Sequence, residues 1–329
     1  MKRMLVVLIL LTLLVAVALP ALAAEKTPTT LAVGWNLLSP TTSPPPRASQ
    51  AMAYDTARGV AVLFGGADDT FSYDDTWQWS SSTLEWTQAT PAHHPSARWG
   101  HAMAYDEARG VVVLFGGISG THLNDTWIFD GTDWSELTPA DAPSPRILSA
   151  MAYDPQQQVV VLYGGEFSIL EYGDTWTFDG LTWQAQPVAG PPARAGSGMV
   201  YDSRRQVMTL FGGGISEDPF AYRDTWEWTG SGDWVEVTPA QSPSKRERMG
   251  MVYSPRFKRT FLYGGLDGGF GYYNDTAIWN GQRWQSGTFD PSPSARCCLA
   301  MVYDPVVRGV LLFGGSATGA EMNDVWYFR

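Results

Sequence analysis

Six arginines recur along the chain at similar spacing, and they are the first residues that could do chemistry. They are Arg47, Arg98, Arg146, Arg194, Arg246 and Arg296. Grouped around one opening, six guanidinium groups would form a ring of positive charge able to hold a carboxylate or a sulfate. A ligand rarely needs all six, so the recurrence favours a structural role in which each arginine joins neighbouring repeats through an aspartate or a carbonyl.

The two positions after each arginine differ between repeats and are better candidates for a specific site. The pairs are Ala48-Ser49, Trp99-Gly100, Ile147-Leu148, Ala195-Gly196, Glu247-Arg248 and Cys297-Cys298. If these positions surround a channel mouth, the residues that stand out mark a binding site there. The predicted site comprises Arg98, Trp99, His101, Glu247, Arg248, Arg296, Cys297 and Cys298.

Cys297 and Cys298 are the only two cysteines of the chain, and they are adjacent. The sequence leaves two possibilities open: a vicinal disulfide, which an oxidising compartment would favour, and two free thiols in a packed strand. A metal site built on the pair is less well supported, because no histidine is near in the sequence.

All four histidines fall in the first two repeats, and they are His93, His94, His101 and His122. Three of them share one short segment. No carboxylate accompanies these three at a spacing typical of metal ligands, so the pattern has low specificity for a metal. We predict no metal and no cofactor.

The loops that follow each Gly-Gly pair carry aromatic and acidic side chains. The aromatic residues are Phe71, Phe167, Phe220, Phe270 and Tyr272, and the acids include Asp68, Glu166 and Asp267. Exposed rings beside acids would suit the apolar face and the hydroxyls of a sugar, so Phe71, Phe220 and Phe270 join the predicted binding residues. The alternative is that these rings pin the loops by hydrophobic packing.

A repeat of about fifty residues positions all of these side chains. Gly-Gly pairs mark its six copies, at Gly65-Gly66, Gly116-Gly117, Gly164-Gly165, Gly212-Gly213, Gly264-Gly265 and Gly314-Gly315. The second copy shows every part: Arg98, the segments 102–106, 111–117 and 125–129, then Trp134 and Thr138-Pro139. The repeated units begin near residues 47, 98, 146, 194, 246 and 296.

Each segment of the repeat has the pattern of a β-strand. Short apolar, β-branched and aromatic runs end at Gly, Pro or Asp. Four strands make one small antiparallel sheet that cannot bury both faces alone, whereas sheets arranged radially cover one another. The sequence therefore predicts an all-β, six-bladed β-propeller that occupies residues 25–329 as a single domain.

The double glycine, the aromatic strand, the later tryptophan and the arginine that opens the next unit resemble the Kelch-repeat β-propellers. The resemblance covers residues 31–329 and extends to the galactose oxidase central-domain-like superfamily. Asp-Thr-Trp in place of the usual tyrosine is similar to bacterial secreted Kelch chains. It implies a ligand face formed by the loops after Gly-Gly and before each arginine. It also implies a structural role for His101, since many Kelch repeats carry histidine there.

The pattern also predicts how the ring closes. The chain stops at Asp324–Arg329, one strand short of a complete unit. The missing tryptophan strand is present near the N-terminus, at about residues 31–40, and Trp35 precedes Arg47 by the same spacing as Trp134 precedes Arg146. We expect this N-terminal strand to complete the last blade.

Residues 1–24 are typical of an export signal. Lys2 and Arg3 precede an apolar run, and Ala21–Ala24 supply a small-residue cleavage site, although an uncleaved membrane anchor is the alternative. The net charge of −11 would become about −13 without Lys2 and Arg3, which argues against nucleic acid as a partner. We expect a secreted or periplasmic monomer that has no membrane span after cleavage.

The expected function is a non-catalytic binding or scaffold module that recognises an unknown protein or glycan. The alternative is a carbohydrate-active propeller enzyme, such as a sugar isomerase or a sialidase-like or oxidase-like enzyme, that uses loop carboxylates or histidines. Against an oxidase-like enzyme, repeats three to six contain no histidine, whereas such a copper site takes ligands from distant blades. Against a sialidase-like enzyme, Ser72–Trp77 only superficially resembles the S-x-D-x-G-x-T-W motif. Fold alone does not settle function.

Overall fold

The computed structural model describes residues 34–216, 220–269 and 271–329. Within these ranges the chain forms β-strands joined by turns and contains no helix. The described residues accordingly include no helix that could cross a membrane. The export signal predicted at residues 1–24 lies outside the described residues and stays a prediction.

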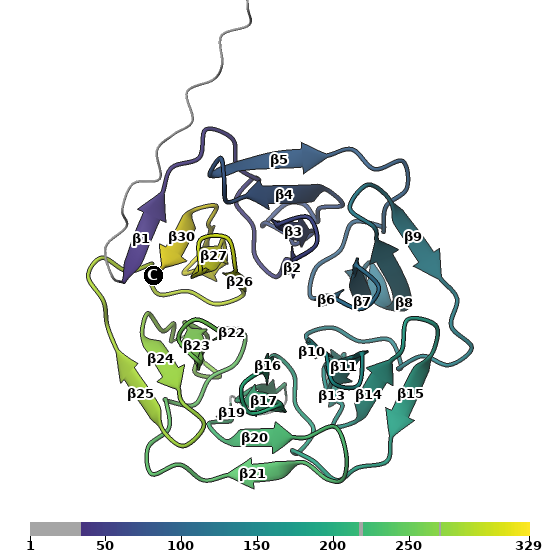
Figure 1. Ribbon diagram of the computed structural model, residues 1–329, viewed down its shortest axis with the longest axis vertical. Helices are drawn as coiled ribbons and strands as arrows, with labels where there is room; N and C mark the ends of the chain where they lie inside the picture. The colour runs from purple at the N-terminus through teal and green to yellow at the C-terminus, as the bar shows by residue number, and fades with distance from the viewer. Residues whose placement is uncertain (1–33, 217–219, 270) are drawn as a thin grey trace, which may run out of the picture.

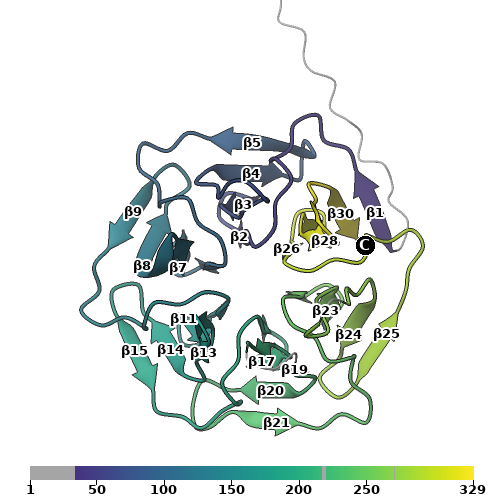
Figure 2. The same ribbon diagram turned by 180° about the vertical axis from the view of Figure 1, so that it is seen from behind.

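Six four-stranded antiparallel sheets, blades 1 to 6, form a ring (Figures 1 and 2). Their innermost strands line openings along the axis of the ring, which we call the central channel. Blade 1 contains β2 (Ala51–Asp55), β3 (Val60–Phe64), β4 (Thr76–Ser80) and β5 (Glu85–Ala89). Blade 2 contains β6 (Ala102–Asp106), β7 (Val111–Ser119), β8 (Thr121–Phe129) and β9 (Trp134–Leu137). Blade 3 contains β10 (Ala150–Asp154), β11 (Val159–Tyr163), β14 (Thr175–Phe178) and β15 (Trp183–Gln186).

The second half of the ring repeats this order. Blade 4 contains β16 (Gly198–Asp202), β17 (Val207–Phe211), β20 (Thr225–Trp228) and β21 (Val235–Val237). Blade 5 contains β22 (Gly250–Ser254), β23 (Arg259–Tyr263), β24 (Thr276–Trp279) and β25 (Trp284–Gly287). Blade 6 contains β26 (Ala300–Asp304), β27 (Gly309–Phe313), β30 (Val325–Phe328) and β1 (Trp35–Leu38).

The N-terminal strand closes the ring, as the sequence predicts. In Figure 1 the purple β1 lies beside the yellow β30, and the two strands pair from Trp35 with Phe328 to Leu38 with Val325. The indole nitrogen of Trp35 also donates a 2.9 Å hydrogen bond to Thr276 of blade 5. The predicted six-bladed all-β propeller with four-stranded blades is thus confirmed.

Large and small apolar side chains alternate along the innermost strands, and this alternation allows each blade to pack against its neighbours. Met52 and Tyr54 of blade 1 share a buried cluster with Ala300 and Val302 of blade 6, so large side chains of one blade meet small ones of the preceding blade. In the same way, Met103 and Tyr105 of blade 2 pack with Ala53 of blade 1, and Met151 and Tyr153 of blade 3 pack with Ala104 of blade 2. Neither face of a blade is polar, because each face is covered by another blade.

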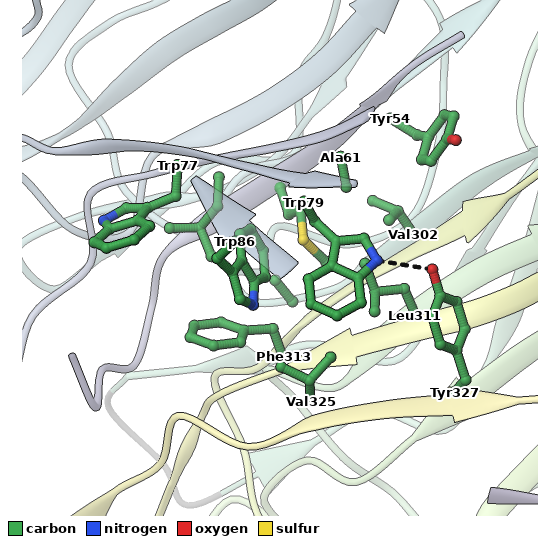
Figure 3. Close-up of a cluster of buried hydrophobic side chains, with 13 residues drawn as sticks. Tyr54, Ala61, Trp77, Trp79, Trp86, Val302, Leu311, Phe313, Val325 and Tyr327 are labelled. Atoms are coloured by element: carbon green, nitrogen blue, oxygen red, sulfur yellow. Dashed lines mark hydrogen bonds between the residues drawn. The ribbon is translucent and has the colours of Figure 1, made fainter. Parts of the chain in front are cut away.

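Tryptophans fill the space between the outer strands. Figure 3 shows the boundary of blades 1 and 6, where Trp79 donates a 2.9 Å hydrogen bond to the hydroxyl of Tyr327 and Trp86 packs edge-on against Phe313 at 5.1 Å. Within the described residues, five tryptophans that lie in or just before an outer strand donate a hydrogen bond to a threonine of the preceding blade. These pairs are Trp35–Thr276, Trp134–Thr76, Trp183–Thr126, Trp234–Thr175 and Trp284–Thr225.

Candidate functional site at the channel mouth

The loops after each Gly-Gly and the loops before each arginine meet on one face of the propeller, which we call the Gly-Gly face. Isolated backbone bridges join the residue after each arginine to a residue just after the Gly-Gly pair of the same blade. The bridges are Ala48–Ala67, Trp99–Ile118, Ile147–Glu166, Ala195–Gly214, Glu247–Leu266 and Cys297–Ser316. Short hairpins extend three of these loops: β12 (Glu166–Phe167) with β13 (Leu170–Glu171), β18 (Gly214–Ile215) with β19 (Phe220–Ala221), and β28 (Ser316–Ala317) with β29 (Ala320–Glu321).

The six repeat arginines are buried and bound within the protein. Arg98 donates to both carboxylate oxygens of Asp125 at 2.7 Å and to the carbonyl of Gly116 at 2.9 Å. The equivalent ion pairs are Arg47–Asp75, Arg146–Asp174, Arg194–Asp224, Arg246–Asp275 and Arg296–Asp324. No more than 1% of any of these arginines is exposed, which includes Arg98 and Arg296 of the predicted binding site.

The arginines join neighbouring blades through their backbone, whereas each side chain braces its own blade. Across one boundary, Arg98 N donates to Tyr73 O at 3.0 Å, and Gly66 N donates to Arg98 O at 2.9 Å. The prediction that each arginine joins neighbouring repeats through an aspartate is therefore wrong, because the aspartate partner lies in the same blade as its arginine. Gly65 permits the close approach: its φ is +62°, and a Cβ there would lie 2.7 Å from Arg98 O.

A closed ring of backbone hydrogen bonds surrounds the channel mouth. The second residue after each arginine donates its N–H to the carbonyl of the equivalent residue in the preceding blade, at 2.7 to 2.9 Å. The ring members are Ser49, Gly100, Leu148, Gly196, Arg248 and Cys298. All six have φ between 54° and 68°, in the left-handed region. The ring therefore fixes the backbone at every member and leaves the side chain to vary.

Beneath this ring lies a cavity of about 160 Å³. Two layers of residues line this cavity: the ring residues, and below them the third residue after each arginine. This third residue is polar in blades 1 to 4 and apolar in blades 5 and 6. These residues are Gln50, His101, Ser149, Ser197, Met249 and Leu299. The Oε1 atom of Gln50 and the Nε atom of Arg248 are buried without a hydrogen-bond partner. Buried polar groups are normally paired, so the polar side of this cavity can hold hydrogen-bonding molecules.

His101 is the most isolated polar residue of this layer. Neither ring nitrogen makes a hydrogen bond, and the ring packs edge-on against Phe64 at 5.6 Å. Burial lowers the pKa of His101 to about 3, and the nearby charge of Arg98 adds to this effect against a small opposing contribution from the Phe64 carbonyl. The imidazole is therefore neutral near pH 7, with one nitrogen able to donate and the other able to accept.

Glu247 and Arg248 form a partly buried charged pair at the mouth. Arg248 Nε lies 3.9 Å from Glu247 Oε1, and the side chains are 32% and 17% exposed respectively. Burial raises the pKa of Glu247, while Arg248 opposes that rise and Glu166 and Glu171 reinforce it. The two acids on the β12–β13 hairpin are thus close enough to interact electrostatically with the mouth.

The two cysteines are adjacent free thiols in the structure, and the predicted vicinal disulfide stays a prediction. Cys297 is buried, whereas Cys298 is half-buried and lines the cavity under the ring. Trp99 is also half-buried, and its backbone pairs with Ile118 at the start of the blade 2 hairpin. The structure therefore brings Arg248, Cys298 and His101 to one cavity, with Glu247 and Trp99 at its rim.

Neighbouring hairpins on the Gly-Gly face contact one another. The rings of His122 in blade 2 and Phe167 in blade 3 lie 4.7 Å apart. Ser216 in blade 4 donates from its hydroxyl to Glu166 at 2.7 Å and from its backbone N–H to Glu171. These contacts position the β12–β13 hairpin, which links blades 2, 3 and 4 beside the mouth.

Large apolar side chains are exposed at two places on this face. Phe71 of blade 1 is 66% exposed, and on the β12–β13 hairpin Phe167 is 42%, Ile169 is 66% and Leu170 is 59% exposed. The exposure of Phe71 argues against a role in pinning its loop, whereas Phe167 is partly exposed and also packs against His122. The side chain of Phe220 and the whole of Phe270 lie outside the described residues.

The opposite end of the channel holds a larger opening of about 340 Å³, lined by the innermost strands. The tyrosines there are Tyr54, Tyr105, Tyr153, Tyr201, Tyr253 and Tyr303. Sequence reasoning treats these tyrosines as packing residues, and it misses the polar layer of Gln50, Ser149 and Ser197. The available signal was the third position after each arginine, which changes from polar to apolar between blades 4 and 5.

No group of three or more His, Cys, Asp and Glu side chains in the described residues is placed to hold a metal ion. The fold and this mouth define a β-propeller whose repeated residues are structural and whose variable residues gather on one face. A family model, the KLHDC2/KLHL20/DRC7 Kelch-repeats domain, matches residues 29–213, more than half of the chain. The chain therefore belongs to the Kelch-repeat family. No curated protein matches it.

Proposed function

We propose that this Kelch propeller is a non-catalytic binding module that recognises a protein through its Gly-Gly face. The observation that carries the proposal is the exposed apolar tip of the β12–β13 hairpin, formed by Phe167, Ile169 and Leu170. Contiguous exposed apolar side chains of this kind are typical of interaction sites. The neighbouring hairpin contacts hold the tip in place, which lowers the entropic cost of binding.

The chemistry of the tip favours a protein over a glycan. A sugar site needs aromatic faces together with hydrogen-bonding groups, whereas Ile169 and Leu170 offer only aliphatic surface. Glu166 and Glu171 flank the tip, and the whole chain carries a net charge of −11. We infer that the partner presents an amphipathic segment with apolar and basic side chains.

The place of action is also part of the proposal. Residues 1–24 support export, because a short positive start, an apolar run and a small-residue site follow one another there. The partner would then be met outside the cytoplasm. Detection of the mature chain in the medium or the periplasm, with residues 1–24 removed, checks this part; a full-length chain retained in the cytoplasm would contradict it.

The binding proposal can be tested with a displayed random peptide library selected on the purified propeller. We expect the selected peptides to be rich in apolar and basic residues. A variant with Phe167, Ile169 and Leu170 all changed to Ser should bind them at least about tenfold more weakly, since buried apolar anchors often contribute more than 1 kcal/mol each. The matched control changes the exposed Leu37 and Val235 of the outer strands to Ser and should bind normally.

Two results would contradict the proposal. Selected peptides that bind the hairpin variant as well as the wild type would place recognition elsewhere. Binding on a glycan array, without any peptide selected, would replace the protein partner with a sugar.

A further inference from the structure

The two adjacent cysteines differ sharply in their surroundings. Cys297 is 4% exposed, and its backbone is paired in both directions with Ser316 of the same blade. Cys298 is half-buried and lines the cavity under the backbone ring, so it is the more accessible member of the pair from the channel mouth. The two sulfur atoms lie 2.6 Å apart, in direct contact.

The charges around the pair favour Cys298 as the ionised sulfur. The contact from Cys297 lowers the pKa of Cys298, and Arg248 and the Ser49 hydroxyl act in the same direction against burial and Glu247. The same contact, together with burial, raises the pKa of Cys297 well above its usual range. Tyr272, on the loop of the neighbouring blade 5, is a further titratable group that interacts electrostatically with both cysteines.

We propose that Cys297 and Cys298 form a dithiol–disulfide exchange site at the channel mouth, with Cys298 as the attacking sulfur and a small disulfide such as oxidised glutathione as the substrate. The Cys298 thiolate attacks one sulfur of the small disulfide, which breaks that S–S bond and releases one thiolate. Cys297 then loses its proton to solvent and attacks the Cys298 sulfur. The products are a Cys297–Cys298 disulfide and a second small thiol, so two electrons pass from the pair to the small disulfide.

Arg248 is the positioning residue of this site. It occupies the ring position next to Cys298, and Cys298 N donates to Arg248 O at 2.8 Å. Its guanidinium stabilises the thiolate of Cys298 through space, as cationic neighbours do at reactive cysteines. Gly100 and Gly196 occupy the same ring position in blades 2 and 4, which indicates that the ring forms without an arginine there.

The repeat supplies substitutions that the fold already tolerates. Alanine occupies the position of Cys297 in blades 1 and 4, and serine occupies the position of Cys298 in blade 1. Cys297→Ala and Cys298→Ser should therefore fold, which a thermal unfolding scan verifies. Reduced proteins are then treated with oxidised glutathione and followed by intact mass and by a thiol count after denaturation.

We expect the wild type to lose both thiols and two hydrogen masses without retaining glutathione. Cys297→Ala should accumulate one stable glutathione adduct, because the resolving sulfur is absent. Cys298→Ser should react at least about tenfold more slowly, since Cys297 is buried and less ionised. A wild type that retains glutathione, or a Cys298→Ser variant that reacts as fast as Cys297→Ala, would overturn the proposal.

The role of Arg248 is tested in the Cys297→Ala background through the pH dependence of adduct formation. Arg248→Gly should move the pH at which the rate is half-maximal upward, and Arg248→Lys should restore it in part. A purely structural role would change the unfolding temperature without moving this profile. An unmoved profile in a folded Arg248→Gly protein would remove Arg248 from the site.

Discussion

Each repeat arginine is followed by three residues that meet different requirements. The first pairs with the loop after Gly-Gly, the second closes the backbone ring, and the third points into the layer beneath. The ring constrains only the main chain, so residues as different as Gly100, Leu148 and Cys298 fill one position. Specific chemistry at the mouth therefore depends on side chains that the fold does not select.

His101 carries a prediction about acid stability. Its pKa is about 3 in the folded protein and close to 6.5 in an unfolded chain, so below pH 6.5 the unfolded state takes up a proton that the folded state does not. The free energy of unfolding should fall by about 2 to 3 kcal/mol between pH 7 and pH 4.5 from this group alone. His101→Gln should remove that loss, as measured by denaturant unfolding at both pH values.

The repeat indicates that His101→Gln will fold. Gln50 occupies the same position in blade 1 and donates a 3.1 Å hydrogen bond to Phe313 O, the counterpart of Phe64 O for residue 101. The control is Leu37→Gln, at an exposed position without a titratable group, which should keep the pH dependence of the wild type. If His101→Gln loses as much stability at pH 4.5 as the wild type does, another group controls acid unfolding.

Sequence reasoning reaches some of these residues and misses others for a physical reason. Recurrence alone predicts that the six arginines are structural, and their burial agrees. It does not reveal whether the aspartate partner of Arg98 lies in its own repeat or in the next, because both occur at constant spacing. The left-handed conformation of the ring position is also hidden, since its six residue types share no conformational preference.

At the scale of strands, one hydrogen bond is repeated between blades and missing once. At five boundaries between described blades, a tryptophan in or just before the outer strand donates to the threonine of the preceding blade, which belongs to Asp-Thr-Trp in four cases and to Asp275-Thr276-Ala277 in the fifth. At the sixth, the chain has Asp324-Val325-Trp326, and the indole nitrogen of Trp86 is buried without a partner (Figure 3). A valine methyl therefore stands where the other blades present a hydroxyl.

Val325→Thr should repair this boundary. A new hydrogen bond to a buried unpaired donor should raise the free energy of unfolding by about 0.5 to 1.5 kcal/mol. The reverse change at an intact boundary, Thr126→Val, should lower it by about 1 to 3 kcal/mol because it leaves Trp183 unpaired. Both are measured by denaturant unfolding.

A double substitution isolates the bond itself. In a Trp86→Phe background the indole donor is gone, so Val325→Thr should no longer stabilise and should instead place an unpaired hydroxyl in the core. Equal stabilisation in both backgrounds would mean that the gain has another source.

The strands themselves were predictable, because β-branched and aromatic runs that end at Gly, Pro and Asp leave few alternatives. The short hairpin β12–β13 was not. Its strands are two residues each, and its sequence of acids and apolar residues has no strand period. The hairpin is positioned by contacts with His122 and Ser216 of neighbouring blades, which no local pattern encodes.

For the whole molecule, ring closure makes an N-terminal residue part of the core. Trp35 is 1% exposed, packs against Tyr263 and Phe328 at 5.2 and 5.4 Å, and bonds Thr276. Trp35 begins the first strand of the described residues, where few contacts would be expected, yet its surroundings match those of Trp183. The spacing of Trp35 to Arg47 makes this predictable, since it repeats the spacing found inside the chain.

Trp35→Ala should therefore destabilise the propeller as much as Trp183→Ala does. We expect each to lower the free energy of unfolding by about 3 to 5 kcal/mol, the usual cost of truncating a buried aromatic residue. Leu37→Ala, at a 54% exposed position on the same strand, should stay within about 0.5 kcal/mol of the wild type. If Trp35→Ala behaved like Leu37→Ala, the closing strand would contribute little to stability.

The pairing of β1 with β30 brings Gly34 and Arg329 into mutual contact, with Gly34 N donating to Arg329 O at 2.9 Å and Arg329 N donating to Gly34 O at 3.1 Å. A peptide linker of a few residues could join them without disturbing either strand. The chain could then be cut in the loop before any other outer strand, since every blade has the same construction. Circular permutants that begin in different blades should share one fold. In each permutant, the blade built from both chain ends would be the one in which the new ends are placed.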